Sequence, residues 1–84
     1  MAYTIKFTPA AEREFDRLDR SVRKRIAPAI QGLSIDPRPP GVKKLAGQDL
    51  WRIRVGDYRI VYQIHDRQIL VLIVAIGHRG DVYR

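Results

Sequence analysis

The sequence contains no cysteine, and its 84 residues include only two histidines. The lack of cysteine excludes disulfide and thiol chemistry and leaves the redox compartment open. His65 and His78 have no further ligands at metal-binding spacing, so we expect neither a metal nor a cofactor. The longest apolar run, residues 69–76, is far shorter than the ~20 residues of a membrane-spanning helix. Because no apolar segment follows the start either, we expect a cytoplasmic protein without a membrane partner.

Acidic residues are scarce relative to basic ones. The chain has 9 Asp+Glu against 16 Lys+Arg, a net charge of +7. This excess favours polyanionic partners, namely nucleic acid, an anionic membrane or an acidic protein. A hydrophobic content of 45% is typical of globular chains. Since no repeat, low-complexity tract or linker divides the sequence, we expect one small domain over residues 1–84.

The first half of the chain predicts a strand followed by a helical hairpin. Apolar residues alternate with polar ones over residues 3–7, which indicates a short strand with one buried face. Thr8 followed by proline is typical of a helix N-cap, and we expect a helix over about Pro9–Leu18. Ser21 is a second N-cap candidate, and apolar residues at helical spacing predict a helix over about Ser21–Leu33.

Pro28 conflicts with a straight second helix. An interior proline removes a hydrogen bond and costs roughly 3 kcal/mol. We therefore expect a kink or an early break near Ala27.

The outer surface of the helical hairpin is rich in charge. Four acidic residues are interleaved with its basic residues, which are Arg13, Arg17, Arg20, Arg23, Lys24 and Arg25. A charged helix surface is usually a solvated face, which is our first interpretation. Contact with structured RNA is the second.

Residues 50–64, LWRIRVGDYRIVYQI, form two alternating runs on either side of Gly56-Asp57. Glycine in the first central position predicts a hairpin with a type II′ turn. A two-residue turn sets the register, which pairs Val55 with Tyr58, Arg54 with Arg59, Ile53 with Ile60, and Trp51 with Tyr62. The apolar and aromatic side chains then share one face, which we expect to be buried against the helices. They are Trp51, Ile53, Val55, Tyr58, Ile60 and Tyr62.

Arg52, Arg54 and Arg59 share the opposite face of this hairpin, together with Val61. Like charges directly opposite each other destabilise a strand pair. One interpretation is a prebuilt anion site for phosphate, because arginine presents planar, permanently charged donors. The other is a solvated face whose long stems cover apolar surface. The hairpin alone slightly favours the solvated face.

The last apolar run, Ile69 to Ile76, is rich in β-branched residues and predicts a central strand covered on both faces. If Ile64 pairs with Ile69, then Val74, Ile76 and His78 lie on the face of Arg59. A one-residue shift would place His78 on the other face. The element order predicts an α+β fold with an N-terminal strand, a helical hairpin and a three-stranded antiparallel meander in a small, mostly antiparallel sheet.

This layout resembles the RelE/ParE superfamily of bacterial toxins from type II toxin–antitoxin pairs. The resemblance covers nearly the whole chain, including the connector DPRPPGVKKLAG, and its more specific segments are GDYRIVYQI and IGHRGDVY. RelE-like members cleave messenger RNA in the ribosomal A site, whereas ParE-like members poison DNA gyrase and lack the catalytic set. The resemblance implies three partners, namely the ribosome, messenger RNA and a cognate acidic antitoxin in a heteromeric complex.

The resemblance also implies a set of site residues: Arg52, Arg54, Arg59, Arg79 and Tyr83. Because all five positions carry a compatible residue, we favour a RelE-like endoribonuclease in which a ribose 2′-OH attacks the adjacent phosphate. Arg52 and Arg59 would bind phosphate, and Arg79 would stabilise the phosphate or the leaving group. Tyr83 would stack on a base or orient the nucleophile, unless it only plugs the end of the sheet. Lys43 and Lys44 complete the expected RNA-binding set.

Two departures from the family pattern bear on the mechanism. RelE-like enzymes typically carry lysines where this chain has Arg52 and Arg54, and arginine, unlike lysine, does not readily lose its proton. Arg54 is therefore unsuited to act as a base, and His78 is the substitute unless it is a surface turn residue. We interpret His65 as structural. We also expect no C-terminal helix after Tyr83. A gyrase inhibitor and a non-catalytic or inactive nucleic-acid-binding relative stay open as alternatives.

Overall fold

The computed structural model describes residues 2–78 of the chain. Its elements, in order, are β1 (Thr4–Phe7), α1 (Pro9–Asp16), α2 (Arg20–Ile35), β2 (Lys43–Lys44), β3 (Trp51–Val55), β4 (Tyr58–His65), the single 3₁₀ turn η1 (Asp66–Gln68) and β5 (Leu70–His78). Within this range no helix is both long and apolar enough to cross a membrane.

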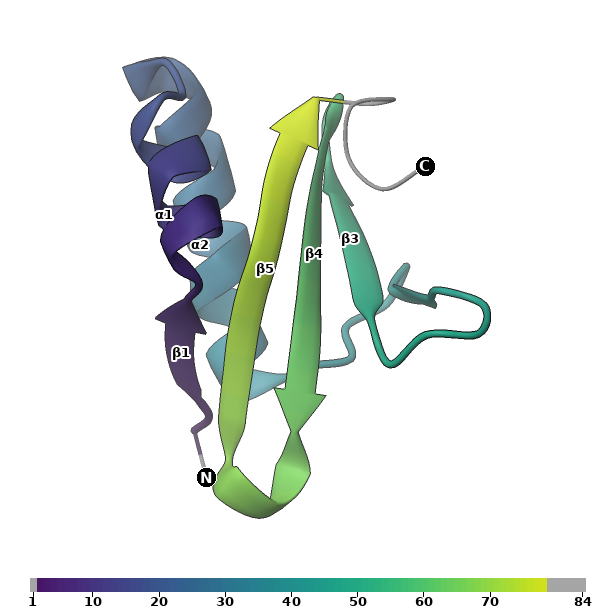
Figure 1. Ribbon diagram of the computed structural model, residues 1–84. Coiled ribbons are helices and arrows are strands. Elements are labelled where there is room, and N and C mark those ends of the chain that lie inside the picture. Colours follow the sequence, from purple (N-terminus) through teal and green to yellow (C-terminus); the bar gives the residue numbers. More distant parts are fainter. Residues whose placement is uncertain (1, 79–84) are drawn as a thin grey trace.

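The strands of residues 2–78 form one five-stranded sheet in the order β1-β5-β4-β3-β2. The β2, β3, β4 and β5 strands pair antiparallel, and β1 adds to the β5 edge in parallel. The two helices pack side by side on the same side of the sheet (Figure 1). The predicted α+β fold is therefore confirmed, and the short strand β2 is an addition that the sequence pattern did not predict.

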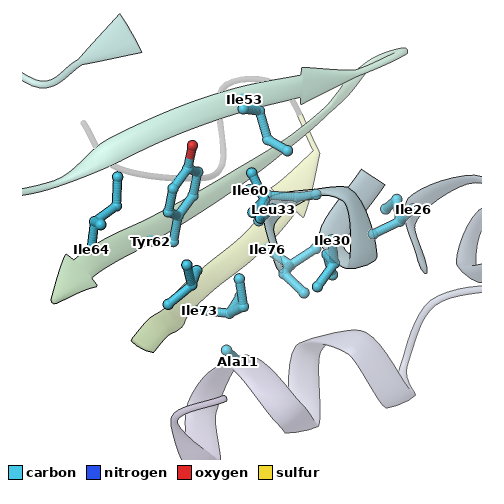
Figure 2. Close-up of a cluster of buried hydrophobic side chains, with 11 residues drawn as sticks. Ala11, Ile26, Ile30, Leu33, Ile53, Ile60, Tyr62, Ile64, Ile73 and Ile76 are labelled. Carbon is cyan, nitrogen blue, oxygen red and sulfur yellow. The ribbon is translucent and has the colours of Figure 1, made fainter. Parts of the chain in front are cut away.

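The main core lies between the helical hairpin and one face of the sheet (Figure 2). The helices contribute Ala11, Ile26, Ile30 and Leu33, and the sheet contributes Ile53, Ile60, Tyr62, Ile64, Val71, Ile73 and Ile76. Burial of Ile53, Ile60 and Tyr62 agrees with the hairpin pattern. Trp51 and Tyr58 are only half buried, because they lie at the margin of this core.

Local hydrogen bonds explain where the two helices begin and end. Thr8 caps α1 as predicted, since its Oγ1 accepts a hydrogen bond from the Ala11 amide at 3.1 Å. The α1 helix ends two residues before the predicted Leu18, and Asp19, not Ser21, precedes α2. Arg23 donates to the carbonyl oxygens of Asp16 and Leu18 at 3.2 and 2.5 Å, which satisfies acceptors at the end of α1.

The expected break at Pro28 is wrong, because α2 runs through this residue to Ile35. Pro28 itself is exposed, whereas Ile26 and Ile30 on either side of it are buried in the core. The buried side chains hold both halves of the helix on the sheet. This packing offsets the hydrogen bond that the proline removes.

Replacing the cap residue tests this account of the fold. Thr8→Ala removes the side-chain acceptor of α1 and should lower the free energy of unfolding by about 1 kcal/mol. Thr8→Ser keeps the acceptor and should remain close to the wild type. Urea unfolding followed by circular dichroism measures both, and equal stability of the two variants would contradict the capping role.

Candidate functional site

The hairpin of β3 and β4 has the predicted register. Arg54 lies opposite Arg59, Ile53 opposite Ile60, and Val55 opposite Tyr58. Gly56 has a φ of 60°, and Asp57 is not among the residues with positive φ. A positive φ at the first central position alone is the signature of a type II′ turn.

The arginine face of the hairpin is the sheet face that the helices leave uncovered. Arg54 and Arg59 are direct cross-strand neighbours there, and Arg59 is half buried. On its other side Arg59 pairs with Gly77 of β5, which carries no side chain to cover it. Below this pair, Leu50 and Val61 are buried with Leu45, Val74 and Ala75 in a second, smaller apolar cluster. These five side chains form a small apolar floor on the sheet face from which the two arginines emerge.

A groove of about 590 Å³ runs along the outer edge of β3. The sheet contributes three basic residues to it, Lys43, Arg52 and Arg54, and Ile53. Its other wall consists of Ala29 and Gly32 of α2 and of the connector residues Pro39, Pro40 and Gly41. In the described part of the chain, β2 pairs with β3 only at Trp51 and Arg52, so the rest of this edge borders the groove. Three cations thus converge on one concave surface with apolar walls.

The side chains of the two lysines of β2 lie on opposite sides of the strand. Lys43 pairs with Arg52 and lines the groove. The Nζ of Lys44 lies 5.7 Å from the centre of the Trp51 ring, on the opposite side of the strand. The structure therefore brings Lys43, but not Lys44, together with Arg52 and Arg54.

Arg38 anchors the connector that forms the groove wall. Its guanidinium bonds both carboxylate oxygens of Asp66, at 3.0 and 3.3 Å, and lies 4.9 Å from the Trp51 ring. The Tyr3 hydroxyl donates to the same carboxylate at 2.7 Å, and the Tyr62 hydroxyl donates to the Pro37 carbonyl at 2.7 Å. These contacts, which we call the Arg38 clamp, join the connector to the residue before β1 and to β3, β4 and η1. The sequence pattern did not identify Arg38, because its partners are distant in the chain.

The clamp also shifts the pKa values of its members. The hydrogen bonds from Arg38 and Tyr3 hold the pKa of Asp66 below its ordinary value. The hydrogen bond to Asp66 raises the pKa of Tyr3. Burial raises the pKa of Tyr62, so its hydroxyl stays protonated as a donor to Pro37.

The predicted register between the last two strands is wrong. Ile64 pairs with Val71 instead of Ile69, and a β-bulge between Val61 and Tyr62 shifts the register once more. Tyr58 therefore lies opposite His78, and the two rings meet edge to face at 5.3 Å. Ile76 is buried in the main core. Of the three residues expected beside Arg59, only Val74 packs on that face.

His78 consequently lies on the opposite face of the sheet from Arg54 and Arg59, since it shares the face of Tyr58. A bulge adds one residue to one strand and so reverses the side-chain alternation beyond it. The alternation of an all-apolar strand carries no signal for such a shift. Arg79 and Tyr83 lie outside the described residues.

Two further observations concern residues outside the groove. His65 is positioned by a 2.9 Å hydrogen bond between its Nε2 and Gln63 Oε1, in keeping with a structural role. Arg25 of α2 lies against Gly56, where an added Cβ would overlap its Nη2. Among residues 2–78, no three His, Cys, Asp or Glu side chains are grouped as metal ligands would be.

The sequence and the fold of this chain can be compared with known proteins. The family model for the ParE toxin of type II toxin–antitoxin systems matches residues 5–83. Toxin RelG of Mycobacterium tuberculosis is 34% identical over 100% of this chain and 99% of its own length. The mRNA interferase toxin RelE of Escherichia coli K12 is 29% identical over 99% of this chain and 92% of its own.

A solved structure supports the same relationship. The toxin–antitoxin complex RelBE2 of Mycobacterium tuberculosis contains a chain that superposes with a TM-score of 0.84 at 30% identity, covering 96% of this chain and 95% of that one. The protein is thus a small α+β toxin of the kind found in such complexes. It belongs to the RelE/ParE family of toxins of type II toxin–antitoxin systems, and the relatives named above are RelE-type.

The pH dependence of stability tests the Arg38 clamp. Because the pKa of Asp66 is lowered in the folded state, the ionised carboxylate stabilises the fold at pH values above its ordinary pKa of 3.8. This stability is lost as the pH falls through the lower pKa that Asp66 has in the folded state. The carboxylate is exposed, so the contribution is small. Asp66→Asn should be less stable than the wild type at pH 7 and should lose less stability on acidification to pH 3.

Urea unfolding at the two pH values measures this difference. Asp49→Asn, in the exposed loop before β3, is the matched control and should follow the wild type. Equal acid sensitivity of Asp66→Asn and the wild type would show that the clamp adds nothing to stability.

Proposed function

We propose that this protein is the toxin of a toxin–antitoxin pair and cleaves messenger RNA on the ribosome. The observation that carries the proposal is the direct opposition of Arg54 and Arg59 beside a groove lined by Lys43 and Arg52. The likeness to an mRNA interferase of Escherichia coli supports the choice of RNA as the substrate.

The reaction we propose is attack by a ribose 2′-OH on the adjacent phosphate. The 2′-OH gives up its proton as the new P–O bond closes a cyclic 2′,3′-phosphate. The P–O5′ bond breaks, and the 5′-oxygen of the next nucleotide leaves and takes up a proton, so that no proton is consumed overall. Negative charge gathers on the phosphoryl oxygens in the transition state. Two arginines that emerge from directly opposed positions of a strand pair would stabilise this charge without reorganisation, which is usually the largest catalytic contribution. The repulsion between Arg54 and Arg59 is relieved when the phosphate binds.

The groove would hold the RNA on either side of the reacting phosphate. Lys43 and Arg52, which line the groove, would bind backbone phosphates, and Ile53, Pro39 and Pro40 would offer apolar surface to a base. Arg79 and Tyr83 remain in the proposal with the roles that the resemblance implies, at the phosphate and at a base.

Proton transfer is the step to which these residues are least suited. A guanidinium group is a poor general base, which argues against Arg54 in this role, and the His78 ring contacts Tyr58 on the other face of the sheet. A role for His78 as the base stays a prediction that the observed register argues against. We propose that the arginines act electrostatically and that catalysis does not depend on this histidine.

The partner in the cell would be an acidic antitoxin. The net charge of +7 and the basic groove suit an acidic chain that covers the arginine face. A relative has been crystallised as a toxin–antitoxin complex. By this likeness we propose a heteromeric complex for the present chain.

A gyrase-directed toxin is the second candidate function. The matching family model is that of ParE toxins, which share the fold. Such a toxin would need no catalytic arginines. The Arg54–Arg59 pair would then be a binding surface only.

Substitutions in the arginine pair test the catalytic proposal. Arg59→Ala should slow single-turnover cleavage of messenger RNA on programmed ribosomes about a hundred- to a thousandfold, the effect of losing one transition-state donor. Arg54→Lys should retain activity, since it keeps the charge and restores the usual family residue. His78→Gln should leave the rate and its pH profile nearly unchanged.

Arg67→Ala is the matched control, because Arg67 is exposed on η1 at the far end of the sheet (Figure 1). Its cleavage rate should equal that of the wild type. A normal rate for a folded Arg59→Ala protein would contradict the proposal. A large loss in His78→Gln, with an altered pH profile, would restore the histidine to the mechanism.

The choice between RNA and gyrase is tested in cells. Induction of this chain should produce new 5′ ends in messenger RNA, detected by primer extension, and leave plasmid supercoiling unchanged. Intact transcripts together with inhibited gyrase would replace the first function by the second. An Arg59→Ala chain induced to the same level is the control for cleavage by host enzymes.

A further inference from the structure

A cluster of basic side chains covers the tip of the helical hairpin, outside the groove. Residues 16–25 read DRLDRSVRKR and hold five basic residues against two acidic ones, which is +3 of the total charge of +7. Arg23 is half buried and bonds backbone carbonyls at the end of α1. The other four side chains are exposed, and we call them the tip cluster: Arg17, Arg20, Lys24 and Arg25.

The tip cluster opposes the stability of the helix that carries most of it. Arg20 and Lys24 are four residues apart on α2, where like charges repel each other. The first turn of α2 holds no acidic residue, and Asp19 at the N-cap makes no side-chain capping hydrogen bond, although the helix dipole favours negative charge there. Within residues 2–78, no ion pair or side-chain hydrogen bond engages these four side chains. An external anion would relieve this repulsion.

The tip cluster adjoins the arginine face of the proposed site. The Arg25 guanidinium packs directly on Gly56, in the turn between Arg54 and Arg59. The tip of the helical hairpin and the β3–β4 turn lie at the same end of the molecule (Figure 1). A polyanion bound at Arg54 and Arg59 can therefore be bordered by a second anionic segment on the tip cluster.

We propose that the tip cluster binds the phosphate backbone of base-paired RNA, as a second RNA site beside the groove. The choice of RNA over DNA rests on the proposed function. Arginine is the preferred side chain for phosphate recognition, and three of the four residues are arginines. Sites for single strands use aromatic stacking platforms, and residues 16–25 contain no aromatic residue. Base-paired RNA is recognised through phosphates and 2′-hydroxyls, which charged side chains alone can contact.

The test measures binding of a blunt RNA hairpin to the full chain as a function of salt concentration. Arg20→Gln with Lys24→Gln removes two cations and leaves the groove and the Arg25–Gly56 packing in place. Its affinity at 0.1 M salt should fall roughly ten- to fiftyfold, and the slope of log K against log[salt] should become shallower by roughly 0.7–0.9 for each phosphate-binding cation removed.

A second double variant is the matched control. Lys6→Gln with Arg67→Gln removes the same charge from exposed positions of β1 and η1. Because these positions lie away from the tip, this variant should keep about half or more of the wild-type affinity and a nearly unchanged salt slope.

The outcomes separate this proposal from the proposed function, because the RNA hairpin is bound without being cleaved. Equal losses in the two double variants would mean that only net charge matters and would overturn the tip site. Equal or tighter binding of a DNA duplex of the same length, with the same dependence on Arg20 and Lys24, would overturn the assignment to RNA. If an acidic peptide bound more tightly than the RNA hairpin, with the same dependence on Arg20 and Lys24, this result would also overturn the assignment to RNA. Loss of cleavage in Arg59→Ala with unchanged hairpin binding would support two separate sites.

Discussion

The repulsion between Arg54 and Arg59 is the constraint around which the functional part of this protein is arranged. Both side chains emerge from the same face because a two-residue turn at Gly56 fixes the pairing of β3 with β4. The opposite face of the same hairpin supplies Ile53, Ile60 and Tyr62 to the main core. Burial of these side chains stabilises the hairpin in the register that keeps the two cations together. The core thus holds a charge arrangement that would be unfavourable by itself.

The groove depends on a different part of the structure. Its outer wall is a proline-rich connector, which has no strand or helix to hold it. The Arg38 clamp supplies the anchorage through Asp66, Tyr3 and Trp51, and Tyr62 fixes the start of the connector through its hydroxyl. Tyr62 therefore has two roles, since its ring fills the core and its polar end positions the wall of the site.

A single β-bulge decides which groups can take part in the chemistry. Without it, the alternation along β5 would carry His78 to the arginine face. With it, the ring lies against Tyr58 on the other side of the sheet, and Val74 fills the apolar floor beneath the arginines. At the β1 side of the same strand, Glu14 of α1 accepts a hydrogen bond from the Ile76 amide at 3.0 Å, so a helix side chain satisfies the edge that β1 leaves open.

The sequence by itself determined the two helices and the strands other than β2, the cap at Thr8, the hairpin register and the shared face of Arg52, Arg54 and Arg59, because each follows from local chemistry or strict alternation. Tertiary structure alone decided the continuity of α2 through Pro28, which rests on packing against the sheet, and the register of β5, where residues 70–76 are all apolar and no pattern marks the bulge. It also decided the contacts of Arg38 with Asp66 and of Arg25 with Gly56. These pairs lie 28 and 31 residues apart, so only the folded chain brings them together.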